Sequence, residues 1–116
     1  MLNEETAQAF AREWIAAWNA HDLERILSHY AEDIRVTSPV AARLSGGAEV
    51  SGKQALRDYF AAGLAYYPDL HFQLEAVFVG ADSLVLSYLN QNGARAAEMM
   101  VLNGEGKVVR MVAHYA

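Results

Sequence analysis

The sequence has 116 residues, of which 53% are hydrophobic and 20% charged, and its formal net charge is −5. A chain of this length and composition can bury a core of its own, so we expect one folded domain over residues 1–116. The acidic balance, without a cluster of Lys and Arg, argues against nucleic acid and acidic membranes as partners, and the absence of Cys excludes disulfides, thiolate metal sites and a cysteine nucleophile.

The first residues carry acidic side chains where a secretory signal would carry a basic region followed by an apolar stretch. No run of residues approaches the roughly 18 apolar residues that a membrane-spanning helix needs. The sequence therefore predicts a cytoplasmic protein.

Two helices are predicted at the start of the chain. Residues 3–19 place apolar side chains three and four positions apart, which is typical of an amphipathic helix, and Asn3 can cap it. Asp22 can cap a second helix in the same way. The apolar positions are Ala7, Phe10, Ala11, Trp14, Ile15 and Trp18 in the first helix, and Leu23, Ile26, Leu27 and Tyr30 in the second.

A short strand follows, because Ile34 and Val36 alternate with polar residues until Pro39 ends the pattern. Residues 39–52 are predicted to form a loop. A third helix is predicted over residues 53–67, with Ser51 as its cap.

The second half of the sequence predicts four strands, at residues 70–79, 83–91, 95–103 and 107–115, separated by short turns such as Asn92-Gly93. Helices followed by consecutive strands predict an α+β fold with an antiparallel sheet. The three helices would cover one face of the sheet, and the other face would meet solvent or a partner.

Several short segments, in their order and spacing, resemble one family. They are residues 14–22 (WIAAWNAHD), 29–33 (HYAED), 38–39 (SP), 52–56 (GKQAL) and 103–109 (NGEGKVV). Together they resemble the SnoaL-like and ketosteroid-isomerase-like branch of the nuclear-transport-factor-2-like superfamily. The resemblance implies three N-terminal helices on a strongly curved, mostly antiparallel sheet that forms a cone-shaped pocket. Relatives use this scaffold for ketosteroid isomerisation, polyketide cyclisation, dehydration, epoxide opening or no chemistry, so function must be argued from the site.

The resemblance also gives three positions at which a steroid isomerase needs its catalytic groups. The base position corresponds to Ser38, which cannot take a proton from carbon at neutral pH. The tyrosine position corresponds to Trp14, whose N–H can donate a hydrogen bond but not a proton. The third position corresponds to Glu98, which keeps a carboxyl group. The steroid-isomerase mechanism is therefore disfavoured.

Glu98 is the candidate catalytic residue. Strand alternation places it on one face with Ala96, Met100 and Leu102, and burial there would raise its pKa and suit it to general acid or base catalysis. The alternative is that this face meets solvent, or that Glu98 pairs with Arg95 or Arg110.

His114 is the second candidate for proton transfer, but alternation favours a surface or interface position for it. Met111, Ala113 and Tyr115 make the opposite face of the same strand, which the resemblance places toward the pocket.

The expected pocket-lining residues are Trp14, Trp18, Tyr30, Ser38, Tyr59, Met100 and Tyr115. Ordinary core packing explains aromatic residues at helical spacing, but their N–H and O–H groups would also need partners that a ligand can supply. Such a pocket suits flat, apolar ring compounds. His21, His29 and His71 are expected to be structural or solvated, and no pattern of metal ligands or cofactor-binding motif occurs.

Three functions remain open from the sequence: a cofactor-free isomerase, cyclase or dehydratase that uses Glu98, a non-catalytic module that binds a small hydrophobic molecule, and an interaction domain. A homodimer through the outer sheet face is compatible with all three, and Val77, Val79, Val101 and Val112 are expected on that face.

Overall fold

The computed structural model describes the backbone of residues 1–116 and every side chain except that of Ser45. Its elements, in chain order, are α1 (Glu4–Asn19), α2 (Leu23–Leu27), β1 (Tyr30–Thr37), α3 (Pro39–Ser45), β2 (Glu49–Ser51), α4 (Lys53–Tyr66), β3 (Gln73–Val79), β4 (Ser83–Leu89), β5 (Arg95–Leu102) and β6 (Val108–Tyr115). Among the described residues, no helix is both long and apolar enough to span a bilayer.

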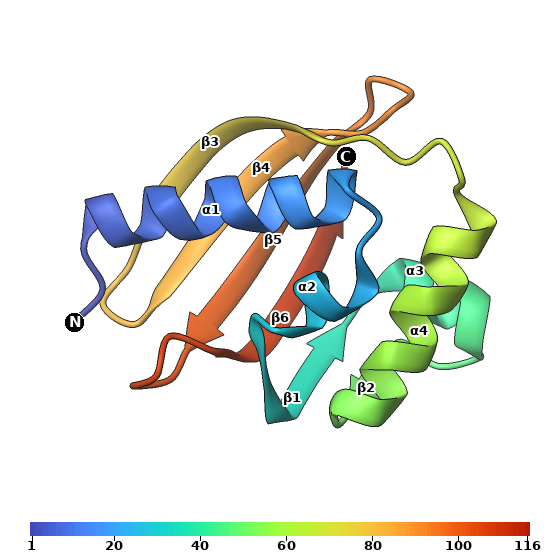
Figure 1. Ribbon diagram of the computed structural model, residues 1–116, viewed down its shortest axis with the longest axis horizontal. Helices are drawn as coiled ribbons and strands as arrows, with labels where there is room; N and C mark the ends of the chain where they lie inside the picture. The colour runs from blue at the N-terminus through green and yellow to red at the C-terminus, as the bar shows by residue number, and fades with distance from the viewer.

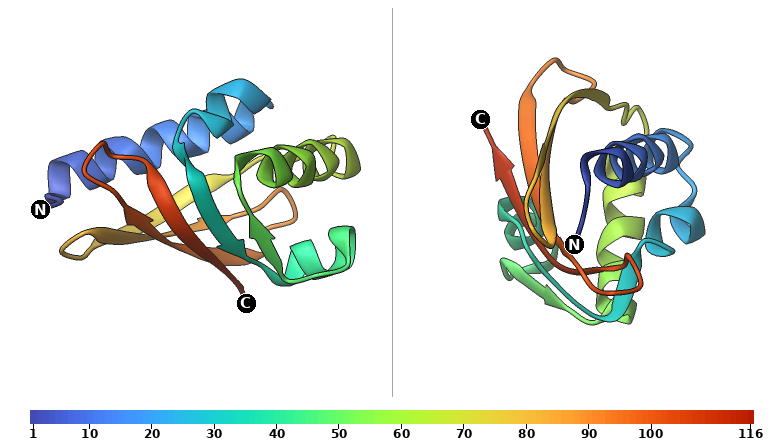
Figure 2. Two further views of the ribbon diagram at one scale, coloured as in Figure 1. Left: turned by 90° about the horizontal axis from the view of Figure 1, so that it is seen from below. Right: turned by 90° about the vertical axis from the view of Figure 1, so that its left-hand side faces the viewer.

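The strands form one curved sheet in the order β2-β1-β6-β5-β4-β3. Helix α1 lies across this sheet, and α4 stands beside it at the end where α3 lies (Figure 1). The strands make one layer with the long helices on its concave side (Figure 2). The α+β fold with a mostly antiparallel, strongly curved sheet is therefore confirmed.

The pairing of β1 with β6 is parallel, in a sheet whose other pairings are antiparallel. Antiparallel neighbours need only a short turn, as at Asn92-Gly93, but β1 and β6 are more than seventy residues apart in the chain. Alternation along one strand contains no information about such a distant partner.

Helix α1 forms as its periodicity predicts. Asn3 caps it, with its side-chain oxygen accepting from the Thr6 N–H at 2.8 Å. The buried stripe is Ala7, Ala11, Trp14, Ile15, Ala17 and Trp18, and it packs against the concave side of the sheet. Asp22 caps α2 by accepting from the Arg25 N–H, as expected.

Two predictions in the first half of the chain are wrong. Tyr30 begins β1 and is not part of the second helix, which ends at Leu27. The predicted loop at residues 39–52 contains α3 and β2. Ser38 caps α3 and Pro39 occupies its first turn, where a missing N–H costs nothing.

The cap of α4 also differs from the prediction. Gly52 takes the cap position without a side-chain hydrogen bond, and the Ser51 hydroxyl donates to Glu49 instead.

A bulge in β3 changes which residues face outward. The register shifts by one residue between Leu74 and Ala76, so Val77 lies opposite the buried Leu86 and packs against the core. Val79 likewise lies opposite the buried Leu84. The expectation that these two valines face outward is therefore wrong, and Phe78, 63% exposed, takes the outer position.

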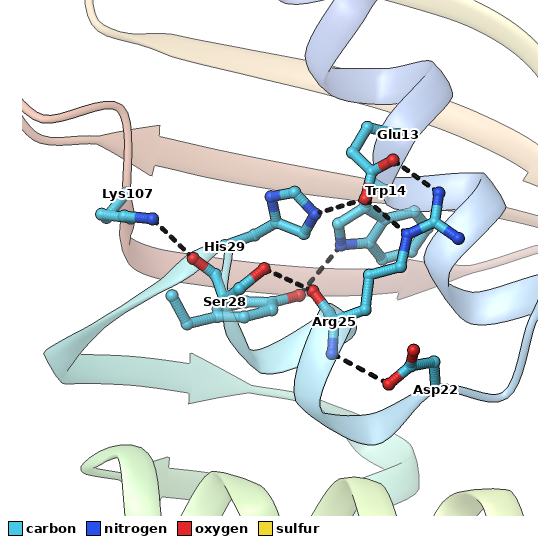
Figure 3. A network of polar contacts seen from close by, with 8 residues as sticks. Glu13, Trp14, Asp22, Arg25, Ser28, His29 and Lys107 are labelled. Carbon is cyan, nitrogen blue, oxygen red and sulfur yellow. Dashed lines mark hydrogen bonds and ion pairs between the residues drawn. The ribbon is translucent and has the colours of Figure 1, made fainter.

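A polar network joins α1, α2 and the start of β1 (Figure 3). The Glu13 carboxylate accepts from Arg25 Nε at 2.9 Å and Nη2 at 2.6 Å, and it lies 3.1 Å from His29 Nε2. The Arg25 hydrogen bonds hold the pKa of Glu13 at about 2, with a smaller contribution from His29. This network ties the α1–α2 hairpin to β1.

We expect Glu13→Gln to lower the free energy of unfolding by about 0.5–1 kcal/mol at pH 7, because the pair is 39–40% exposed and water screens it. Glu13 ionises at a lower pH in the folded than in the unfolded chain. The contribution should thus be complete above pH 4.5 and disappear as the pH falls toward about 2. Urea titrations at pH 7 and at lower pH would measure this difference.

Glu105→Gln provides a matched control, because it removes the same charge from a turn where, within the described structure, only the backbone N–H of Glu105 makes a hydrogen bond. An equal loss in both variants, or a loss at Glu13 that does not change with pH, would contradict the stabilising role of the network.

Candidate functional site

A cavity of about 280 Å³ lies between the concave side of the sheet and the helices. Its inner wall holds the aromatic rings of Trp14, Trp18, Phe60, Phe72 and Tyr88. Its outer part is lined by α3, the end of α4 and the β4–β5 turn, which lie at the same end of the molecule (Figure 1). Arg43, Asn92 and Tyr115 are exposed there, so the cavity reaches the surface at this end.

The aromatic rings pack against one another and still leave this space. Trp14 stacks on Phe72 with ring centres 5.9 Å apart, and Phe72 meets Tyr88 at 4.3 Å. Trp18 packs edge-on against Phe60 at 4.8 Å. The two tryptophans therefore wall the cavity and do not fill it.

Glu98 lies in the cavity wall and is only 3% exposed. The Tyr88 hydroxyl donates to its Oε1 at 2.8 Å, whereas its Oε2 has no hydrogen-bond partner in the described part of the chain. Burial raises the pKa of Glu98 to about 8, against the opposing effect of the Tyr88 hydrogen bond. Glu98 is thus mostly protonated at neutral pH, with Oε2 the oxygen that is free to carry the proton.

The arginines that were alternative partners for Glu98 have other contacts. Arg95 pairs with Glu75 at 2.8 Å on the exposed side of the sheet. Arg110 Nη1 donates to the Arg35 carbonyl oxygen at 3.4 Å. Glu98 faces inward, between Leu86 and Ala113 on the neighbouring strands.

Trp14 and Tyr30 supply hydrogen bonds to each other, so their polar groups do not depend on a ligand. The Trp14 indole N–H donates to the Tyr30 hydroxyl at 2.9 Å, and that hydroxyl donates to Met111 Sδ at 3.5 Å. Burial raises the pKa of Tyr30 well above its ordinary value.

Two of the expected lining residues do not belong to the cavity wall. Tyr30 is 1% exposed and Met100 is completely buried, and both pack in the core next to the wall. Trp14, Trp18, Ser38, Tyr59 and Tyr115 do line the cavity.

Ser38 has a structural role. Its Oγ accepts from the Val40 N–H at 3.1 Å as the cap of α3 and lies 3.3 Å from the Tyr59 hydroxyl. The position at which the resemblance implied a catalytic base is thus occupied by a helix cap.

The histidines lie outside the cavity wall. His114 is exposed, with its Nδ1 3.2 Å from the Val112 carbonyl oxygen, and His71 is exposed as well. His21 Nε2 lies 2.8 Å from the Leu70 carbonyl oxygen, and His29 belongs to the Glu13 network. Within the described residues, no three His, Asp or Glu side chains gather as they would around a metal ion.

Tyr88, Gln91 and Arg43 line the cavity, and sequence reasoning missed all three. Tyr88 could have been found, because it pairs directly with Ala96 across the predicted Asn92-Gly93 turn and so lies diagonal to Glu98 on the same face. Gln91 and Arg43 fall in connecting segments, where alternation gives no direction for a side chain.

The family model of the SnoaL-like domain matches residues 11–116. The chain therefore belongs to the SnoaL-like family, within the nuclear-transport-factor-2-like superfamily. No curated protein matches its sequence.

Solved structures share this fold. A SnoaL-like protein of unknown function from Burkholderia thailandensis is 39% identical, with a TM-score of 0.94 over 100% of this chain and 99% of that one. A putative SnoaL-like isomerase from Agrobacterium tumefaciens is 22% identical, with a TM-score of 0.77 over 95% and 97% of the two chains. SalBIII, an epoxide hydrolase/cyclase-like enzyme of pyran ring formation in salinomycin, is 19% identical, with a TM-score of 0.78 over 100% and 95%.

The raised pKa of Glu98 makes stability depend on pH. The folded chain keeps the proton up to about pH 8, whereas the unfolded chain loses it near 4.5. The contribution of Glu98 to stability should therefore be most favourable below pH 4.5 and become less favourable as the pH rises toward 8. We expect Glu98→Gln to abolish this dependence. The free energy of unfolding of the variant should therefore increase by about 3 kcal/mol relative to that of the wild-type protein as the pH rises from 5 to 8.

Urea titrations across this pH range would measure the effect, with Glu105→Gln as the control for loss of a surface carboxylate. Infrared difference spectra should also show the carbonyl stretch of a protonated carboxylic acid at pH 7 that Glu98→Gln lacks. A wild-type protein without that band, whose stability matches the variant's at all pH values, would refute a neutral Glu98.

Proposed function

We propose that this protein binds a small, hydrophobic, ring-containing molecule in the cavity and converts it by cofactor-free acid/base chemistry, of the isomerase, cyclase or dehydratase type, with Glu98 as the acid. The observation that supports this most directly is the buried Glu98 in an aromatic wall, with one oxygen held by Tyr88 and the other without a partner in the described part of the chain. A carboxylic acid whose pKa lies near 8 can give up a proton at neutral pH when a substrate oxygen gains negative charge.

These contacts indicate how Glu98 would act as the acid. Glu98 Oε2 would donate its proton to a carbonyl, epoxide or leaving-group oxygen of the substrate as charge develops there. The carboxylate so formed keeps the Tyr88 hydrogen bond at Oε1, which limits the cost of the buried charge. The aromatic wall excludes water that would otherwise compete for the reacting group.

Ser38 is committed to capping α3 and cannot act as a base opposite Glu98. Isomerisation through removal of a proton from carbon would therefore require Glu98 to be the base as well. In acid-assisted ring closure, epoxide opening or dehydration, Glu98 would give its proton to the substrate oxygen, and the carboxylate so formed would take up the proton that the attacking hydroxyl, water or C–H group loses. SalBIII, which shares the fold, is described as an epoxide hydrolase/cyclase-like enzyme.

The second candidate is a binding module that holds a hydrophobic molecule without converting it. Two of the three steroid-isomerase positions are occupied by Ser38 and Trp14, and both serve the framework. A cavity without a base can still bind.

A thermal-shift panel of steroids, polyketide-like phenols and monoterpenoids would test binding. A ligand at 100 times its dissociation constant should stabilise the fold by about 2.7 kcal/mol. We expect Glu98→Gln to keep this thermal shift, because both side chains are neutral at pH 7, but to lower product formation by about 100-fold or more. Chromatography of the incubated ligand would measure conversion.

The possible outcomes separate the candidates. Conversion by the variant at the wild-type rate would rule out the role of Glu98. A ligand recovered unchanged from the wild-type protein would favour the binding module, and a panel without any thermal shift would favour an interaction domain.

We also propose that the protein forms a homodimer through the outer face of the sheet. Phe78, Val85, Met99 and Val112 lie side by side in one row across β3, β4, β5 and β6. Val101 lies beside Val85 and Met99 in the adjacent row. An apolar row of this kind on a sheet face that no helix covers favours self-association.

Met99→Glu should convert the dimer to a monomer, because two copies of a charge would be buried where the rows meet. Sedimentation velocity would measure the change, and Ala61→Glu, on an exposed position of α4, adds the same charge elsewhere. A wild-type protein that sediments as a monomer at all concentrations would contradict the dimer.

A further inference from the structure

The polar groups of the cavity divide between its two ends. At the inner end, Glu98 is neutral at pH 7 because burial raises its pKa to about 8. At the outer end lies Arg43, on α3, which is exposed and lines the cavity. Between them the wall is mostly aromatic and aliphatic.

Arg43 is an unpaired cation. Ion pairs occupy Arg25, Arg35, Lys53, Arg57 and Arg95, and Arg43 is not among the ion-paired residues of the described structure. Arg12, Lys107 and Arg110 also have no ion pair in the described structure, but of these four cations only Arg43 lines the cavity. An arginine at the cavity mouth that has no carboxylate partner provides a binding site for an anion.

Two tyrosine hydroxyls accompany this guanidinium. Tyr59 and Tyr115 both line the cavity, and burial raises the pKa of each, with a further raising effect from Glu98 and a small opposing effect from the positive charge of Arg43. Arg43, Tyr59 and Tyr115 thus line the same cavity. A guanidinium can bind a carboxylate through two parallel N–H hydrogen bonds, and phenol O–H groups can donate to the same carboxylate.

Gln91, at the same end of the cavity, has a polar atom without a partner in the described structure. Gln91 Oε1 is buried and makes no hydrogen bond to any described residue. The β4–β5 turn that carries Gln91 is held by Asn90 Oδ1, which accepts from the Asn92 and Ala94 N–H groups at 2.9 and 3.0 Å. Because an amide oxygen accepts hydrogen bonds and does not donate them, Gln91 Oε1 is open to a donor group of a ligand and not to its carboxylate.

Building on the proposed function, we infer that the ligand is a ring-containing carboxylic acid, bound as its anion, and that Arg43 determines this specificity. The carboxylate lies at the cavity mouth against Arg43 and the hydroxyls of Tyr59 and Tyr115. The ring lies among Trp14, Trp18 and Phe72, and a ring oxygen meets Glu98. A cavity of about 280 Å³, near the lower limit of ordinary ligand pockets, restricts this molecule to a small ring system.

The inference is tested with 2-naphthoate and methyl 2-naphthoate, which share a ring system and differ in charge. Calorimetry on the wild-type protein should show binding of the acid at least tenfold tighter than that of the ester. Arg43→Gln should weaken acid binding about tenfold and change ester binding by less than twofold. Arg43→Lys should retain part of the preference, since it keeps the charge but not the planar fork.

Arg12→Gln is the matched control, because it removes the same charge from an exposed position of α1 that is outside the cavity wall. It should leave both affinities unchanged. Equal binding of acid and ester by the wild-type protein, or equal weakening of both by Arg43→Gln, would overturn the role of Arg43 and leave the proposed binding of ring compounds intact. Failure of both probes to bind would contradict the proposed function together with this inference.

Discussion

The burial of one carboxyl group constrains the whole interior of this protein. Glu98 stands on the concave side of the sheet, among aromatic rings and without a cation beside it in the described structure. A charged carboxylate would be very unfavourable there, so the group remains neutral and its pKa rises to about 8. The neutral acid still needs hydrogen bonds. Tyr88 satisfies one oxygen, and the other remains available for a ligand.

Several polar groups around Glu98 are already used by the fold, although the Trp18 indole N–H is not, and this narrows what the cavity can do. Trp14 and Tyr30 satisfy each other, and Ser38 caps the short helix that closes one side of the cavity. Each of these groups would otherwise carry a desolvation penalty of its own. A ligand therefore makes its polar contacts with the atoms that remain unpaired. These atoms are a better guide to its position than the full set of polar residues in the wall.

The sequence predicted the parts of the molecule that depend on local periodicity. Alternation along β5 placed Glu98 on one face with Ala96 and Met100, which is the inward face in the structure, and Asn92-Gly93 located the turn that brings Tyr88 beside it. Non-local pairing and irregular geometry were not predictable in this way. The bulge near Leu74 adds one residue without any mark in the alternation, which reverses the faces of Val77 and Val79. Arg43 was missed because Ser38-Pro39 was taken as the end of a strand, although the same pair also begins a helix.

The two ends of the cavity are held by structures of different rigidity. Glu98 lies on a strand paired on both sides, with Leu86 and Ala113 as its neighbours, so its position is fixed by continuous backbone hydrogen bonds. Arg43 lies on α3, a seven-residue helix between Ser38 and the left-handed Gly46. Side chains on paired strands are held more precisely than side chains on short connecting segments. Substitutions in α3 can therefore change which molecule enters the cavity without moving the acid, so one sheet can support the same proton transfer on different ring compounds.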